Sequence, residues 1–310
     1  MAFHVFIDGA HGTTGLKIRE YLEDRDDIEI IEIDEQKRKD LDERVKMTQK
    51  ADVSILCLPD QASKELAEAA PDDVRLIDTS TAHRVNPDWV YGMAELQPGQ
   101  RKKIKNASRV ANPGCHATGF ISLVKPLEAD GVCGAEYPFT SFCVTGYSGG
   151  GKKMIARHED PDRPSYLVSP GQYGLTQQHK HLPEMMKMTG ISLAPSFCPI
   201  VGDFYSGMVM TVPLRKELME KKYGVKDLVK LYQDYYNGEK LITVNEEAPD
   251  DGFIHSDLKA GKNSLEIFVT GNDERPLVIS RFDNLGKGAS GAAVQNLNIM
   301  LGIEETKGLL

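Results

Sequence analysis

One cysteine of the chain, Cys115, lies in a setting suited to nucleophilic chemistry. It follows a turn-forming Asn-Pro-Gly triplet at 112–114 and precedes a helix-like run at 117–127. A thiol at a helix N-terminus lies near free N–H groups and the positive end of the helix dipole, and both favour the nucleophilic thiolate. The sequence therefore predicts that Cys115 attacks an electrophilic carbon, and the alternative is a tolerated loop cysteine.

The other four cysteines lack such surroundings. Cys57 and Cys143 lie within apolar strand-like runs, where cysteine acts as a small core residue, and Cys133 and Cys198 have no supporting context. Five cysteines without CxxC spacing indicate neither a disulfide framework nor a structural zinc site. We therefore expect reduced thiols, a cytoplasmic location and no metal.

A cysteine nucleophile needs a proton relay, and the segment QQHKHLPEM supplies candidates. It contains His179, His181 and Glu184 at a predicted helix start. We expect Glu184 to pair with His179 through a bend, so that His181 points elsewhere. His181 remains the rival for the relay, and a surface turn with two solvated histidines is the alternative to both.

Two loops that follow strand-like runs carry groups suited to anions. DTSTAHRV contains Ser80 and Arg84, and a guanidinium binds carboxylate or phosphate through two parallel hydrogen bonds. A surface salt bridge is the alternative there. VTGYSGGGKK contains Ser148 and three glycines, whose N–H groups can form an anion nest, with a flexible hairpin tip as the alternative.

Gly9, Gly12 and Gly15 form a GxxGxxG loop between a strand-like run and a helix-like run. Glycine permits a tight turn and a close approach to a pyrophosphate, whose charge the helix N-terminus favours. GxxGxxG is a variant of the commoner GxGxxG, so a plain tight turn is the alternative. The strand before and the helix after favour a dinucleotide site.

The end of the second predicted strand gives conflicting signals for NAD and NADP. Asp34 lies about twenty residues past the loop, where an acid would hold a ribose 2′-hydroxyl. Lys37, Arg38 and Lys39 follow and would hold a 2′-phosphate, or they belong to a solvated helix start. The residues alone leave the choice open.

These groups depend on the elements that position them. Over the first ~110 residues, helix-like runs alternate with strand-like runs, a pattern typical of a Rossmann-type doubly wound parallel sheet. The strand-like runs are 3–7, 28–34, 52–59 and 74–80. Beyond Cys115, long strand-like runs with few helices predict an α+β domain with a mixed sheet, and a small-residue helix over 288–301 should pack back against the first domain.

The expected division therefore has a dinucleotide-binding domain at 1–115, completed by the C-terminal helix at 288–310. A substrate, catalytic and dimerisation domain would occupy 116–287. The chain is 40% hydrophobic and 27% charged, as in a soluble globular protein, and its net charge of -9 argues against nucleic acid or an anionic membrane as the main partner. No apolar run approaches the ~18 residues of a membrane span, and the N-terminus lacks the basic segment of a signal peptide.

Several stretches, in one order over nearly the whole chain, resemble the N-acetyl-γ-glutamyl-phosphate reductase family in its shorter (type 2) form, within the aspartate-semialdehyde dehydrogenase-like superfamily. They are GAHGTTGLKIREYL, ILCLPDQAS, DTSTAHRV, ANPGCHATGF, VTGYSGGGKKMI, HKHLPEM, GDFYSGM and DNLGKGASGAAVQNLNIMLG. An aspartate-semialdehyde or related phosphorylating aldehyde dehydrogenase is the alternative enzyme. A dinucleotide-binding regulatory protein with a dead site is disfavoured, because Cys115, His179 and Glu184 are all present.

The resemblance implies that NADPH reduces N-acetyl-γ-glutamyl phosphate to N-acetylglutamate 5-semialdehyde in arginine biosynthesis, with release of phosphate. Cys115 would form a thioester, which hydride transfer converts to a hemithioacetal. His179, oriented by Glu184, would match the proton relay. Arg84, Asn112, Ser148 and His179 would bind a small-molecule acyl phosphate, in a homo-oligomer that is a dimer or a tetramer.

The resemblance also implies which residues bind NADP(H). They come from the glycine loop, from loops after strands and from the loop before the last helix. They would be Gly9, His11, Gly12, Thr13, Thr14, Gly15, Arg38, Pro59, Ser80, Gly149, Gly150, Asn284, Lys287 and Gly288.

Overall fold

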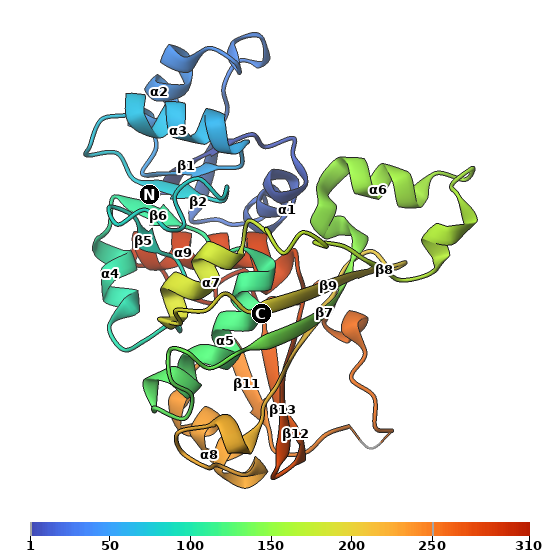
Figure 1. Cartoon of the computed structure of the whole chain (residues 1–310). Helices are drawn as coiled ribbons and strands as arrows, with labels where there is room; N and C mark the ends of the chain where they lie inside the picture. Colours follow the sequence, from blue (N-terminus) through green and yellow to red (C-terminus); the bar gives the residue numbers. More distant parts are fainter. Residues whose placement is uncertain (1, 250) are drawn as a thin grey trace. The chain divides into compact units, whose positions relative to one another are not determined.

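The computed structural model describes residues 2–249 and 251–310, and the chain divides into two compact units (Figure 1). The first unit comprises Met1–Gly114 and Ala289–Leu310, and the second comprises Cys115–Gly288. The first unit contains a parallel sheet flanked by helices, and the second contains a mixed sheet. The predicted fold class, a Rossmann-type sheet plus an α+β domain, is confirmed.

The sheet of the first unit has six strands in the order β2-β1-β3-β4-β6-β5. Every pairing between neighbouring strands is parallel. The strands are β1 (Phe3–Asp8), β2 (Ile28–Ile31), β3 (Val53–Leu56), β4 (Leu76–Asp78), β5 (Val90–Tyr91) and β6 (Arg109–Ala111). β3 and β4 are buried throughout, as expected of inner strands of a parallel sheet that is covered on both faces.

Helices link and cover these strands. They are α1 (Thr13–Leu22), α2 (Leu41–Lys50), α3 (Asp60–Ala69), α4 (Gln100–Asn106) and α9 (Gly291–Leu301), with the short 3₁₀ helix η1 (Glu35–Lys37) after β2. α9 contacts α1, α4, β3 and β4, and almost all of it is buried. Its first turn, Gly291-Ala292-Ala293, has small side chains that allow this close packing.

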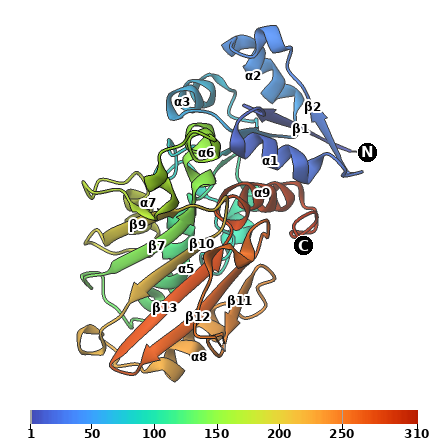
Figure 2. The same cartoon turned by 90° about the vertical axis from the view of Figure 1, so that its right-hand side faces the viewer.

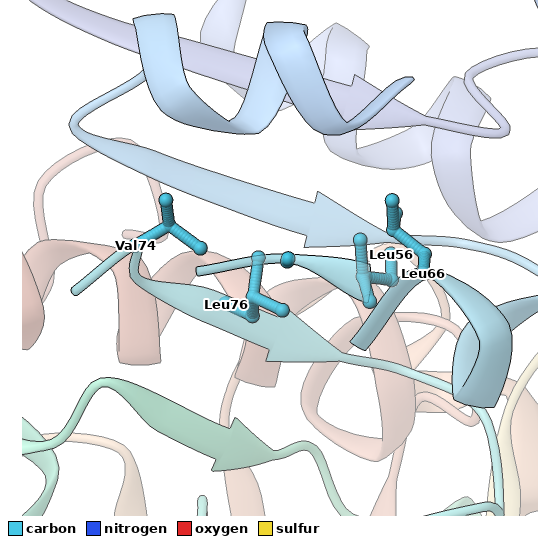
Figure 3. Close-up of a cluster of buried hydrophobic side chains, with 5 residues drawn as sticks. Leu56, Leu66, Val74 and Leu76 are labelled. Atoms are coloured by element: carbon cyan, nitrogen blue, oxygen red, sulfur yellow. The ribbon is translucent and has the colours of Figure 1, made fainter. Parts of the chain in front are cut away.

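An apolar cluster lies between α3 and the sheet of the first unit (Figure 3). Leu56 of β3, Leu66 of α3 and Leu76 of β4 are fully buried, and Val74 leads into β4. Burying each such side chain contributes roughly 1.5–3 kcal/mol. The cluster therefore holds α3 against β3 and β4.

The sheet of the second unit has seven strands in the order β11-β12-β13-β10-β7-β9-β8 (Figure 2). They are β7 (Thr140–Gly146), β8 (Gly171–Gln172), β9 (Ser196–Gly202), β10 (Met208–Pro213), β11 (Ile242–Asn245), β12 (Leu265–Asn272) and β13 (Arg275–Phe282). The pairs β7–β9 and β11–β12 are parallel, and the other pairs are antiparallel. The helices of this unit are α5 (Cys115–Ala129), α6 (Gly151–Glu159), α7 (Leu182–Thr189) and α8 (Val225–Tyr235).

Helix α5 is the buried spine of the second unit, in contact with β10, β13, α7 and α8. Pro126 lies inside it and has no N–H to donate to the carbonyl four residues earlier, that of Ser122. The hydroxyl of Tyr236, just after α8, donates to this Ser122 carbonyl at 2.8 Å. A tertiary hydrogen bond thus replaces the missing helical one, and α5 continues through the proline.

The described part of the chain contains no helix of the length and apolar character that a membrane crossing requires.

Candidate active site

Cys115 is the first residue of α5 and is half-buried. A side chain at Gly288 would bring its Cβ to 2.9 Å from the Cβ of Cys115. Gly288 is held in place by its own N–H, which donates to the carbonyl of Asp283 at 2.9 Å. The sequence predicts that Gly288 contacts the cofactor. In the structure, a glycine at this position also leaves room for the side chain of Cys115.

The residue after the cysteine, His116, is buried and lies at the centre of an aromatic cluster. Its ring centroid is 5.3 Å from that of His179 and 5.5 Å from that of His181. Its Nε2 is hydrogen-bonded to the Tyr173 hydroxyl, and its Nδ1 is 3.7 Å from the Cys143 sulfur. His116 is not among the predicted site residues, although its position directly after Cys115 in the first turn of α5 was a usable signal.

Burial sets the charge of His116. Desolvation, followed by the charges of His179 and Lys180, lowers the pKa of its imidazole from 6.5 to about 3. Burial likewise raises the pKa of the Cys143 thiol and that of the Tyr173 phenol, so both stay protonated. The layer beneath the nucleophile is therefore neutral at physiological pH.

The rings of His179 and His181 meet edge to face, with their centroids 4.7 Å apart and their planes at 87°. The backbone N–H of His181 donates to Nδ1 of His179 at 3.2 Å. Because Nδ1 accepts this hydrogen bond, a His179 ring that carries one proton holds it on Nε2. The bend before α7 thus presents His179 in one tautomer.

The carboxylate of Glu184 lies beside His181, with Oε1 3.9 Å from Nε2, and both side chains are buried. His181 is the N-cap position of α7, and residues three apart on a helix share a face. The sequence analysis expected Glu184 to orient His179 directly. The structure places the Glu184 carboxylate 3.9 Å from His181, whose backbone N–H in turn donates to His179.

Ser148 is buried in the 3₁₀ helix η2 (Tyr147–Gly150), so the alternative of a flexible hairpin tip is wrong. Its hydroxyl accepts a 3.0 Å hydrogen bond from Asn284 Nδ2, and Asn284 Oδ1 accepts from the N–H of Gly207 at 2.8 Å. Gly149 and Gly150 lie in η2, and Lys287 is buried in the π-helical turn η6 (Gly286–Ser290). These predicted cofactor residues lie in two segments that the Ser148–Asn284 hydrogen bond joins.

In the first unit, the glycine loop takes the tight form that the sequence predicted. Gly9 has φ +83, and a side chain there would collide with the Cys57 carbonyl. A Cβ at Gly15 would lie 2.5 Å from the Gly9 carbonyl oxygen. Gly12 is the N-cap of α1 and donates its N–H to that carbonyl at 2.9 Å. Thr13 and Thr14 begin the helix.

This loop borders a cavity of about 500 Å³ that is confined to the first unit. The lining includes Gly9, His11, Gly12, Arg38, Lys39 and Pro59. Arg38 is held by Glu35, with Nη1 and Oε1 2.7 Å apart. Asp34 caps η1 by accepting from the N–H of Gln36 at 2.9 Å, and it is not among the lining residues. Arg38 and Lys39 therefore face the cavity together with the carboxylates Asp8, Glu32 and Glu35, and Asp34 does not.

The remaining predicted residues of this unit form a buried polar network at the ends of β4 and β6. Asp78 accepts from the Ser80 hydroxyl at 2.7 Å and contacts Nδ1 of His83 at 2.6 Å. Arg84 is buried, so it is not part of a surface salt bridge; it donates to the carbonyls of Asn112 and Thr79, each at 3.0 Å. The Asn112 amide donates to the Ala289 carbonyl at 3.0 Å.

No group of three or more histidine, cysteine, aspartate or glutamate side chains suited to a metal ion was found among residues 2–249 and 251–310.

Two family models match the chain. "Semialdehyde dehydrogenase, NAD binding domain" matches residues 4–107, and "Semialdehyde dehydrogenase, dimerisation domain" matches residues 115–284. The chain is 45% identical over 320 residues to N-acetyl-gamma-glutamyl-phosphate reductase 2 of Nostoc sp., with 98% of each chain covered. It is 46% identical over 305 residues to the N-acetyl-gamma-glutamyl-phosphate reductase of Brucella canis, with 96% of this chain and 98% of the relative covered.

Solved structures with the same fold are more distant in sequence. Aspartate semialdehyde dehydrogenase II of Vibrio cholerae, complexed with ASA, has a TM-score of 0.72 at 16% identity, covering 97% of this chain and 99% of the other. Aspartate semialdehyde dehydrogenase of Francisella tularensis has a TM-score of 0.72 at 13% identity, covering 96% and 100%. At such identities the likeness concerns the fold.

Proposed function

The chain belongs to the N-acetyl-gamma-glutamyl-phosphate reductase family, an oxidoreductase family with semialdehyde dehydrogenase domains, and from that premise we propose that it reduces N-acetyl-γ-glutamyl phosphate to N-acetylglutamate 5-semialdehyde with release of phosphate. The observation that carries the proposal is the half-buried Cys115 at the start of α5, directly beside a cluster of three histidines. The product is an intermediate of arginine biosynthesis.

The sulfur of Cys115 begins the reaction. The helix N-terminus favours the thiolate, which attacks the acyl carbon of the substrate. The bond from that carbon to the phosphate oxygen breaks, inorganic phosphate leaves, and a thioester remains on Cys115. A thioester accepts hydride more readily than a carboxylate and holds the carbonyl in place.

His179 is the proton donor in this scheme. Its Nδ1 accepts from the backbone N–H of His181, so Nε2 is the atom that would carry the proton. This proton neutralises the oxygen that becomes the hemithioacetal hydroxyl, and its return releases the aldehyde and the thiolate. Glu184 supports His181 and so acts on the donor at one remove.

The first unit has the features that a dinucleotide needs: a tight glycine loop at the start of α1, a cavity beside it, and basic residues on the cavity wall. When bound, the nicotinamide cofactor supplies the hydride. Gly9, Gly12 and the first turn of α1 would hold the pyrophosphate. Arg38 and Lys39 would hold a 2′-phosphate, which supports NADP(H) as the preferred form.

The remaining assignments follow from the same scheme. Arg84, Asn112 and Ser148 would bind the anionic groups of the substrate. The five cysteines are free, which agrees with a cytoplasmic location.

We also expect a homo-oligomer. Phe142 points outward from β7, between its register partners Cys198 of β9 and Thr211 of β10, and is 45% exposed. A large apolar side chain on an open sheet face suits a subunit interface. Sedimentation of the wild type against Phe142→Arg tests this, and a monomeric wild type would contradict it.

The reaction is best tested in reverse, because the aldehyde is more stable than the acyl phosphate. Purified protein with phosphate and NADP⁺ should oxidise N-acetylglutamate 5-semialdehyde, with kcat/KM at least about 10³ times that for aspartate semialdehyde. Cys115→Ser should lose turnover yet retain NADPH binding by fluorescence. Cys133→Ser, which removes a buried cysteine that has no role in this mechanism, is the matched control. Preference for aspartate semialdehyde, or turnover by Cys115→Ser, would refute the proposal.

A further inference from the structure

Gln177 has an unusual backbone in the loop that leads to the catalytic histidines. Its φ is +57, and it is the one non-glycine with positive φ among residues 2–249 and 251–310. For a residue with a Cβ, this left-handed conformation costs about 1–2 kcal/mol. Such a conformation persists when the surrounding structure holds it in place, and it is found most often at functional sites.

The side chain of Gln177 makes the contacts that hold it. Its Nε2 donates to the Phe197 carbonyl at 2.7 Å, and its Oε1 accepts from the Phe197 N–H at 2.9 Å. One amide group thus satisfies both backbone groups of a β9 residue, as a neighbouring strand would. The backbone N–H of Gln177 also donates to the Gly174 carbonyl at 3.0 Å, which closes the turn.

This amide replaces a strand that ends early. The edge strand β8 pairs with β9 only through Gly171 and Gln172, and the N–H of Tyr173 adds one more hydrogen bond, to the Pro199 carbonyl at 3.0 Å. The main chain then turns at Gly174, whose φ is +66. The side chain of Gln177 then forms hydrogen bonds to β9 at Phe197. The loop that leads to His179 is therefore attached to β9 at Tyr173 and at Gln177.

Two residues at these attachments, Phe197 and Tyr173, also contact the histidine cluster. The Phe197 ring is fully buried, 5.1 Å from the ring centroid of His116 and 5.0 Å from that of His179. The Tyr173 hydroxyl is hydrogen-bonded to His116, and its ring lies 6.2 Å from His179. A shift of this loop would move the proton donor relative to Cys115.

From these contacts we infer that Gln177 is a positioning residue of the reductase: its amide acts as a surrogate strand that fixes His179 and Phe197 at the site of the cysteine. The inference rests on the proposed function for its catalytic meaning. The clamp itself is a property of the fold and can be measured without turnover.

The test uses two variants of Gln177. Gln177→Gly relieves the backbone strain but removes the side-chain hydrogen bonds to Phe197, and Gln177→Glu keeps the side-chain shape but loses the N–H donor. Gln178→Gly, at the next position, which is exposed, is the matched control. We expect kcat to fall about 10-fold or more in both Gln177 variants, with unchanged NADPH affinity and little change in Tm, and to stay near wild type in the control. Because a protonated glutamic acid both accepts and donates, the activity of Gln177→Glu relative to wild type should rise as the pH falls toward 5.

Labelling of His179 by diethyl pyrocarbonate, followed by peptide mass spectrometry, reads the clamp directly. The rate should rise several-fold in Gln177→Gly and stay unchanged in Gln178→Gly. Wild-type kcat in both Gln177 variants, or unchanged labelling in Gln177→Gly, would overturn the inference. If the wild type lacks reductase activity while labelling still responds, the proposed function fails and the clamp stands.

Discussion

The neutral, buried His116 should make the stability of the protein depend on pH in a calculable way. The pKa of its imidazole is lowered to about 3 in the fold, against 6.5 in the unfolded chain, chiefly by desolvation. Between these values only the unfolded chain takes up the proton. The contribution of the neutral His116 to the free energy of unfolding is therefore complete above pH 6.5, and it is lost as the pH falls toward 3.

The magnitude follows from the size of the shift. Each pKa unit corresponds to about 1.4 kcal/mol, so lowering the pH from 7 to 5 should remove about 2 kcal/mol through this one residue. Urea unfolding at pH 7, 6 and 5 measures the loss in the wild type and in His116→Gln, whose side chain does not titrate. The variant will be less stable at pH 7, but its pH slope should be shallower by that amount.

A matched control removes an exposed histidine. His255→Gln is that control, because this side chain is 55% exposed and lacks the burial that sets the charge of His116. If His116→Gln and the wild type lose the same free energy between pH 7 and pH 5, the imidazole is charged in the fold, and the neutral layer described beneath Cys115 does not exist.

Three further predictions concern the glycine loop, the cofactor phosphate and the proton donor. Gly9→Ala should lower Tm by several degrees, because its φ of +83 and the Cys57 carbonyl exclude a side chain. Gly12→Ala should keep the wild-type Tm, because Gly12 has φ −75 and the nearest contact of an added Cβ is 3.4 Å. Equal Tm values for the two variants would contradict this account. Arg38→Ala should weaken NADPH about 10-fold or more while leaving NADH unchanged, as measured by fluorescence titration, and equal losses would show no contact with the 2′-phosphate. His179→Asn should lower kcat by about 10²–10⁴, and a larger loss in His181→Asn would transfer the donor role to His181.

The amino-acid sequence by itself predicted the order of the elements and the place of Cys115 at the start of a helix. Alternating strand-like and helix-like runs report local burial, so they predicted the parallel sheet before Cys115 and the mixed sheet after it. The Asn-Pro-Gly turn before Cys115 is likewise local, and α5 begins at that cysteine. The glycine spacing predicted a tight loop, because Gly9 and Gly15 meet constraints within seven residues of each other.

Only the tertiary structure decided which histidines meet and what Glu184 supports. His116 and His179 are far apart in the sequence, and their rings come together in the fold, where Phe197 of β9 contacts both. Glu184 lies beside His181 because the two residues are three apart at the start of α7, whereas His179 precedes the N-cap of that helix. The clamp of Gln177 on Phe197 depends on an edge strand that stops early, and no local pattern encodes the end of a strand pairing.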